Sequence, residues 1–342
     1  KEKVFRDTDS WPKPPAYQGN PFAAGGVGWK CYSTVFEGLF AYVGVSGTIY
    51  NRLAESYEHM GDKTVIHLQQ NVKWNDGEPF TSKDVWAYYT LNNGAQLMRY
   101  ITNIETPDDN TVIFTWNTPA PNDTLKMQLI AVDMQGTIPY HIYKKYVDIA
   151  APLLEKGKPT DDLTKRGAYG KEYDDATIEA LNKNWQDFVK ETPPKPIGTG
   201  CFMVDSVTAS DMILVKNPEY WQKDNVKFDK MILKQVDTNA GFAMLKSGKV
   251  ERGDGTPNRD ILESVLASNK DLVHYQTLDN ATVGLVFNIQ KEPFNDVKFR
   301  QAINYILDKE KIKDVGNFYG KTSEYSLIGM PFSYSDLWIS KD

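Results

Sequence analysis

The chain has 342 residues, 41% of them hydrophobic, which is enough for two or three domains with apolar cores. Lysine and arginine total 39 and aspartate and glutamate total 45, so the net charge is −6 and nothing indicates a nucleic-acid surface. No apolar run approaches the roughly 18 residues needed to cross a bilayer. Aromatic residues make up 12% of the chain, and we expect most of them in the core and a minority in a cleft for an extended ligand.

The glycine-rich stretch 25–28 is the first local signal. Residues 1–18 before it are polar and contain proline, which predicts irregular structure. The stretch lacks the lysine and the spacing of a phosphate loop, so we reject a nucleotide site and interpret it as an entry whose backbone can approach another group closely. A helix is predicted to follow, with these apolar residues on one stripe: Val35, Phe36, Leu39 and Phe40.

The next signals form a strand, a turn and a capped helix. Residues 65–68 are rich in β-formers, and Asn75-Asp76-Gly77 is a turn sequence. Thr81 and Asp84 have the spacing of a capping box, in which each side chain bonds the other residue's backbone N–H. The helix that begins there is expected to bury Val85, Trp86 and Tyr89. The segment is interpreted as mainly structural.

The middle of the chain gives further strands and one clear amphipathic helix. Residues 112–116 alternate like a strand, and residues 137–140 are predicted to end another. The helix carries Ile178, Leu181, Trp185 and Phe188 on one face. The proline-rich residues 193–196 are interpreted as a linker.

The last part of the chain again mixes strands and helices, which predicts the α/β class. Residues 201–207 and 212–216 are expected to form a hairpin. The other predicted elements are strands at 231–236 and 283–288 and helices at 240–246 and 297–307. The last helix is expected to turn these residues inward: Val297, Ala302, Ile303 and Ile306.

Three blocks in a fixed order are the most informative feature. They are VKWNDGEPFTSKDVWAY (72–88), PIGTGCFMVDSV (196–207) with KNPEYW (216–221), and VFNIQKEPFNDVKFRQAINYILDKEKI (286–312). Together they resemble the large extracellular solute-binding proteins of ABC importers, the peptide/nickel/oligosaccharide-binding family. The resemblance covers most of the chain. It implies a periplasmic-binding-protein-like fold of type II, with two lobes around a cleft.

The resemblance also implies a domain organisation. Residues 1–50 and 195–277 would form the first lobe, residues 51–194 a subdomain inserted into it, and residues 278–342 the start of the second lobe. Because family members are substantially longer, we expect a truncated chain whose second lobe is incomplete and leaves apolar faces exposed.

Ligand contacts in this family come from loops of the first lobe and the crossover into the second. The residues that match these positions here are Gly25, Gly26, Val27, Trp29, Asp254, Gly255, Asp279 and Asn280. The inserted subdomain sometimes adds an aromatic side chain, for which Tyr100 is the candidate. Two positions depart from the family pattern: Cys201 stands where proline is usual, and residues 250–252 replace an Ile/Val-Asp-Ile/Val run.

The function that the resemblance implies is capture of an oligopeptide outside the cytoplasm and its delivery to the permease subunits of an ABC transporter. No cofactor or catalytic residue is implied. The location would be the periplasm or the surface of a Gram-positive cell. Residues 1–11 contain no signal-peptide core, so we expect a targeting segment to have been removed, with a lipid anchor as one form of membrane attachment.

Oligosaccharides of the plant-wall type are the alternative ligand. The pattern around Trp11, Pro12 and Pro15 looks like that of family members that bind such sugars, and Trp29 beside a glycine loop suits stacking on a sugar ring. Nickel is not expected, because the four histidines, at 59, 67, 141 and 274, have no ligand spacing. The two cysteines, Cys31 and Cys201, form no C-x-x-C motif and are expected to be free thiols.

A glycoside hydrolase is a remote alternative. Such an enzyme needs two carboxylates about 5–9 Å apart, and Glu251, Asp254 and Asp279 could be imagined in those roles. No spacing marks a pair, however. The sequence also lacks the G-x-S-x-G and H-E-x-x-H motifs and a phosphate-loop lysine. We therefore expect no catalytic residue and no metal site.

Overall fold

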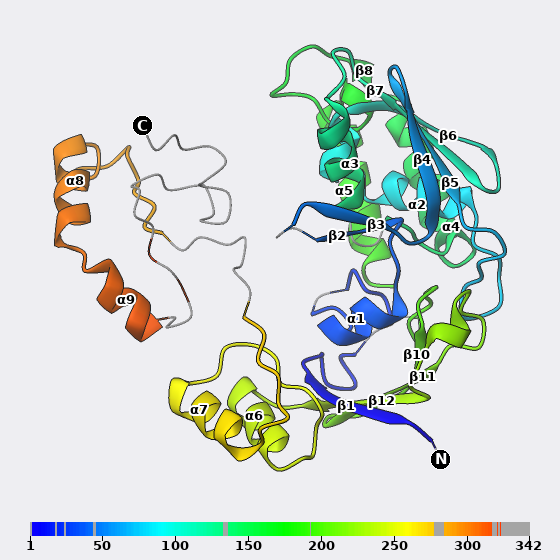
Figure 1. Cartoon of the computed structure of the whole chain (residues 1–342). Helices are drawn as coiled ribbons and strands as arrows, with labels where there is room; N and C mark the ends of the chain where they lie inside the picture. The colour runs from blue at the N-terminus through cyan, green and yellow to red at the C-terminus, as the bar shows by residue number, and fades with distance from the viewer. Residues whose placement is uncertain are drawn as a thin grey trace. The chain divides into compact units, whose positions relative to one another are not determined.

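The computed structural model describes residues 2–17, 19–23, 25–43, 46–132, 136–191, 193–276, 284–316, 320 and 322 (Figure 1). The chain divides into two compact units. The larger unit comprises residues 1–42, 49–236 and 250–252, and the smaller unit comprises residues 43–48, 237–249 and 253–342.

The first sheet of the larger unit joins the N-terminus to residues more than 200 positions away. Its strands are β1 (Val4–Asp9), β12 (Lys230–Gln235), β11 (Asp211–Lys216) and β10 (Phe202–Val207), in that spatial order. β1 runs parallel to β12, and β10 and β11 form the predicted hairpin. The prediction of irregular structure for residues 1–18 is therefore wrong at β1, because the partner that stabilises this strand lies far away in the sequence.

The second sheet of the larger unit is antiparallel, in the order β4 (Ala54–Met60), β5 (Lys63–Leu68), β7 (Thr111–Trp116) and β6 (Ile101–Asp108). β5 and β7 alternate buried and less buried side chains along their whole length, as expected for a sheet with one face on a core. Both strands were predicted.

Four helices belong to the same core as this second sheet (Figure 1). They are α2 (Ser82–Leu91), α3 (Asp123–Ala131), α4 (Tyr140–Leu154) and α5 (Asp175–Phe188), with short elements η1 (Gln96–Arg99), η2 (Ala168–Gly170), β8 (Lys158–Pro159) and β9 (Lys171–Glu172). α2 packs on the strands β6 and β7 and on α4, and α4 packs on α5. Large apolar side chains such as Trp74, Trp116 and Phe188 are fully buried among them, so this is the main core.

Residues 137–140 do not end a strand, contrary to the sequence-based prediction. Residues 137–139 lie outside regular structure and lead into α4, which begins at Tyr140, and the backbone N–H of Ile138 donates to the carbonyl of Asp84 (3.2 Å). The backbone of this segment therefore finds a hydrogen-bond partner at the start of α2 rather than in a sheet.

Helix α1 (Trp29–Val35) is shorter than the apolar stripe predicted. It ends at Val35, and Phe40 instead begins β2 (Phe40–Val43), which pairs with β3 (Thr48–Asn51). All four stripe residues are buried, but they divide between two cores: Val35 and Phe36 pack under the first sheet, Leu39 and Phe40 under the second. The stripe identified buried residues correctly and the helix end wrongly.

The Gly-Thr-Gly sequence at residues 198–200 holds this arrangement together. A Cβ on Gly198 would lie 1.9 Å from the carbonyl oxygen of Val35, and one on Gly200 2.3 Å from that of Thr34. Only glycine allows so close an approach. The fully buried Asn217 then donates from its side chain to the carbonyl of Gly200 (2.8 Å). This motif is therefore structural.

The smaller unit contains a helix pair and two further helices. α6 (Thr238–Lys246) and α7 (Arg259–Ser268) pack around Phe242, Leu262 and Val265. α8 (Val297–Ile306) and α9 (Lys309–Gly316) follow.

Two predictions for the smaller unit are wrong within the described residues. Residues 284–288 form no strand, and residue 283 lies outside the described part. α8 does not turn its apolar face inward: Val297 is 54% exposed and Ile306 79% exposed. An amphipathic helix needs a partner surface before its stripe is buried, and none of the described residues covers this one.

Candidate ligand-binding site

The loop that precedes α1 is built from glycines with left-handed backbone angles. Gly25, Gly26 and Gly28 have φ values of 82°, 62° and 89°. A Cβ on Gly25 would lie 2.7 Å from the Pro12 ring, and one on Gly28 would lie 2.8 Å from the carboxylate of Asp9. Between them Val27 is 1% exposed and anchors the loop in the core under the first sheet. The sequence thus places a tight, anchored turn at the position the resemblance indicated.

Asp9 supplies the cap that the loop itself cannot provide. Gly28 has no side chain, so no local group satisfies the first N–H groups of α1. The Asp9 carboxylate, at the end of β1, instead accepts from the backbone N–H of Trp29 (3.2 Å), Lys30 (2.8 Å) and Cys31 (3.4 Å). It also accepts from the N–H of Ser10 (2.8 Å). The first sheet therefore fixes where the helix begins.

Lys30 makes a second, buried link between α1 and β1. Its ammonium lies 3.0 Å from the Asp7 carboxylate and donates to the carbonyl of Thr8 (2.5 Å). Asp7 is 1% exposed, and the Arg252 guanidinium stands 4.0 Å from its second oxygen. A buried charge left without its partner is costly, so this pair holds α1 in one position on the strand.

Three aromatic rings in contact connect the core to the surface at α1. Trp29 is 59% exposed, and its ring lies nearly parallel to that of Tyr32, with centroids 6.1 Å apart and planes 12° apart. Tyr32 in turn contacts Phe36, which is buried (5.4 Å, 38°). A spacing of three residues places Trp29 and Tyr32 on one face of α1, and Phe36 follows directly after the helix end. A large exposed tryptophan supported in this way is suited to contact a ligand.

The other predicted site residues lie elsewhere. Tyr100 follows η1 in the larger unit, where it is partly buried and packs against the main core. Asp254 and Gly255 belong to the smaller unit, and the Asp254 carboxylate accepts from the N–H of Gly255 (2.9 Å). Asp279 and Asn280 lie outside the described residues. The structure thus places Gly25, Gly26 and Val27 in one loop and Trp29 directly after it at the start of α1, and the role of every one of these residues in ligand binding stays a prediction.

Sequence reasoning missed Asp7, Asp9, Lys30 and Tyr32. The three charged residues carry no local signal, because their partners are about 20 positions away. Tyr32 did carry one: the sequence places Trp29, Tyr32 and Phe36 at helical spacing, which already predicts a shared face.

A polar cluster around Glu37 lies beyond the other end of α1. Glu37 accepts from Arg52 (2.5 Å), from the Tyr220 hydroxyl (3.2 Å) and from the Trp221 indole N–H (3.1 Å). Burial raises the pKa of Glu37, against the lowering effects of Arg52 and these hydrogen bonds. Both carboxylate oxygens have donors, so the cluster ties Tyr220 and Trp221 to the segment that follows α1 and leaves neither oxygen of Glu37 without a donor.

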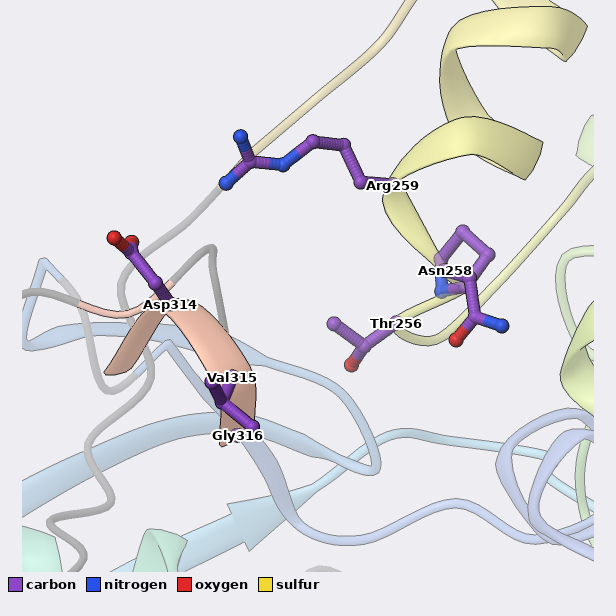
Figure 2. Close-up of a pocket in the computed structure, with 7 residues that line it drawn as sticks. Thr256, Asn258, Arg259, Asp314, Val315 and Gly316 are labelled. Atoms are coloured by element: carbon purple, nitrogen blue, oxygen red, sulfur yellow. The ribbon is translucent and has the colours of Figure 1, made fainter. Parts of the chain in front are cut away.

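A shallow polar hollow occurs in the smaller unit, with a volume of about 350 Å³. Figure 2 shows Thr256, Asn258 and Arg259 on one side of it and Asp314, Val315 and Gly316 at the end of α9 on the other. These six residues are exposed, and the hollow lacks the enclosing apolar walls of a typical small-molecule site. We assign no ligand to it.

The described residues contain no group of three histidine, cysteine, aspartate or glutamate side chains that could hold a metal ion. Cys31 and Cys201 are free thiols, as expected from the sequence, and Cys31 is buried. Within the described part, no helix has the length and apolar character needed to cross a membrane.

The model of the bacterial extracellular solute-binding proteins, family 5, matches residues 48–342 of this chain. The match covers far more than half of the sequence. The chain therefore belongs to this family, and the α/β, periplasmic-binding-protein-like fold expected from the sequence is confirmed by the solved structures described next.

Relatives and solved structures agree with this assignment. A Brucella ovis protein named for ABC-transporter peptide binding is 28% identical over 90% of this chain and 52% of its own length. The periplasmic oligopeptide-binding protein of Salmonella typhimurium is 24% identical over 85% of this chain and 52% of its own length. An oligopeptide-binding protein of Thermotoga maritima has a structure with a TM-score of 0.65 and 20% identity, over 91% of this chain and 53% of that one.

The chain spans about half the length of the curated relatives it matches.

Proposed function

We propose that this protein captures an oligomeric nutrient outside the cytoplasm and delivers it, unchanged, to the permease of an ABC transporter. Membership of a family of extracellular solute-binding proteins carries the proposal. The exposed Trp29 beside a rigid glycine loop, on a helix tied to the first sheet by Asp9 and Lys30, supplies a surface for such a ligand. Tyr100, Asp254, Gly255, Asp279 and Asn280 are proposed as further contacts.

An oligopeptide is the first candidate ligand. The Brucella and Salmonella relatives are named for peptide binding, and an extended peptide can be held through its backbone by loops of this kind.

An oligosaccharide is the second candidate, and Trp29 is the observation that favours it. Sugar rings present flat C–H faces that aromatic side chains cover well. A second structure of the Thermotoga protein, which is named for oligopeptides, was solved with mannohexaose bound. A family member's name therefore does not by itself decide its ligand.

We place the protein in the periplasm or on the surface of a Gram-positive cell, with permease subunits as its partners. The proposed organisation is the one that the resemblance implies: a first lobe of residues 1–50 and 195–277, an inserted subdomain of residues 51–194, and a second lobe that begins near residue 278. A catalytic role is not proposed, because the family consists of solute-binding proteins.

Isothermal titration calorimetry tests this proposal on the complete product of the gene that encodes this chain. The probes are a hexapeptide mixture and a series of cello-oligosaccharides, and hydrolysis of both is monitored by mass spectrometry. We expect micromolar binding of one class, which corresponds to about 8 kcal/mol, with the ligand recovered intact. Binding of neither class, or turnover of the bound ligand, would overturn the proposal.

A further inference from the structure

The orientation of Trp29 depends on a residue outside its own helix. α1 has only seven residues and no side-chain cap of its own. Three of its first backbone N–H groups converge on the carboxylate of Asp9, and a Cβ on Gly28 would touch that same carboxylate at 2.8 Å. The start of α1, and with it the direction of Trp29, is therefore set by the end of strand β1.

The charged groups that hold this surface are engaged by the protein itself. The Asp9 carboxylate faces four backbone N–H groups, and the Lys30 ammonium is turned inward to Asp7 and the carbonyl of Thr8. What α1 presents to solvent beside the glycine loop is the Trp29 ring, which is 59% exposed and stacks nearly parallel on the partly buried ring of Tyr32.

We propose that Asp9 is a positioning residue that holds Trp29, supported from behind by Tyr32, as a preformed aromatic surface, and that this surface stacks on a flat, uncharged face of the bound ligand. The inference rests on the proposed solute-binding function and deepens it. The pyranose ring of an oligosaccharide and an aromatic side chain of a peptide both offer such a face. Because the rings are fixed before binding, little order is lost when the ligand stacks on them.

The test measures affinities of variants made in the complete gene product. The probes are cellohexaose and two alanine-rich hexapeptides, one with and one without a tyrosine. The variants are Trp29→Ala, Trp29→Phe, Asp9→Ala, Asp9→Asn and the double variant of Trp29→Ala with Asp9→Ala. Two controls match them: Tyr50→Ala removes another exposed aromatic side chain, and Asp174→Ala removes the carboxylate that caps α5.

We expect Trp29→Ala and Asp9→Ala each to weaken binding of cellohexaose or of the tyrosine peptide by about tenfold or more, as for loss of an aromatic anchor. Trp29→Phe and Asp9→Asn should recover part of the affinity, and both controls should bind like the wild type. In the background of Trp29→Ala, Asp9→Ala should have little further effect, because Asp9 acts through Trp29.

Three results would overturn the inference. If Asp9→Ala binds like the wild type while Trp29→Ala is weakened, Asp9 does not position the surface. If the wild type binds a probe and neither variant changes its affinity, stacking fails while the proposed function stands. If the wild type binds no probe, the proposed function fails and this inference fails with it.

Discussion

Two helices of this protein start in opposite ways. α2 begins with a capping box, in which the Asp84 carboxylate accepts from the backbone N–H of Thr81 (2.7 Å), three residues before it. α1 begins with a glycine and is capped by Asp9, twenty residues before Trp29 in the chain. The cap of α2 comes from neighbouring residues and can be predicted from the sequence. The cap of α1 forms only once β1 has taken its place in the sheet.

The difference follows the roles of the two helices. α2 is part of the main core, and ten adjacent residues specify it. α1 carries the exposed Trp29, and its position depends on β1, whose partner β12 lies more than 200 residues away. A local cap makes a helix stable wherever it packs, whereas a distant cap also fixes the helix in space. The following predictions test this comparison, from the largest expected effect to the smallest.

Asp84→Ala should have the largest effect on stability. Asp84 is 3% exposed and also accepts from the backbone N–H of Tyr140 (2.8 Å) and from the Trp74 indole (3.4 Å). Alanine leaves these donors buried without an acceptor, so we expect a loss of about 3 kcal/mol in the free energy of unfolding by urea. A loss below about 1 kcal/mol would show that the local cap matters little.

The stability of the protein should depend on pH through the same residue. Burial raises the pKa of Asp84 to about 6, against the lowering effects of its hydrogen bonds. The folded state therefore keeps a proton that the unfolded chain releases from about pH 4 upward, so stability falls as the pH rises from 4 to 6. The contribution is of the order of 3 kcal/mol. Asp84→Asn should remove it, and an unchanged pH profile in this variant would contradict the assignment.

Gly28→Ala should be more costly than Gly77→Ala. Both glycines have left-handed backbones, with φ values of 89° and 96°, but a Cβ on Gly77 meets nothing within 4 Å. Gly77→Ala should therefore cost about 1 kcal/mol from backbone strain alone. In Gly28→Ala the new Cβ would also clash with the Asp9 carboxylate, so we expect a loss of about 2 kcal/mol in the free energy of unfolding. Equal losses in chemical denaturation would show that the contact with Asp9 relaxes freely.

Asp9→Asn should have the smallest effect on stability, about 1 kcal/mol. Asparagine is itself a good cap, but its amide offers one acceptor oxygen where the carboxylate uses two. Circular-dichroism melts of this variant and of Asp174→Asn at α5 compare a distant cap with a local one. The two melting temperatures should fall by similar amounts. A much larger fall for Asp9→Asn would mean that Asp9 holds the sheet as well as the helix.

Much of the fold followed from local sequence patterns. The capping box at Thr81, the hairpin at residues 202–216 and helix α5 were all predicted, because each is specified by residues within about fifteen positions. β1 was missed because its pairing is with β12, and residues 137–140 resemble a strand that they do not form. Helix α8 was predicted as a helix, but its exposed face could not be foreseen from its own periodicity.

The candidate site was predictable only in part. Gly25 to Trp29 emerged from the glycine spacing and the family resemblance, and the structure shows why glycine is needed there. Asp9 and Lys30 could not be found, because nothing in the sequence says that the end of β1 meets the start of α1. Tyr32 could have been found from its spacing to Trp29.

Hydrogen–deuterium exchange of the peptide that spans residues 25–32, with and without saturating ligand, tests the central claim most directly. The account predicts that exchange in this peptide slows on binding, while the peptide containing the start of α2 at Thr81 stays unchanged. Unchanged exchange at residues 25–32, together with ligand protection elsewhere in the protein, would show that the ligand does not meet the chain at Trp29.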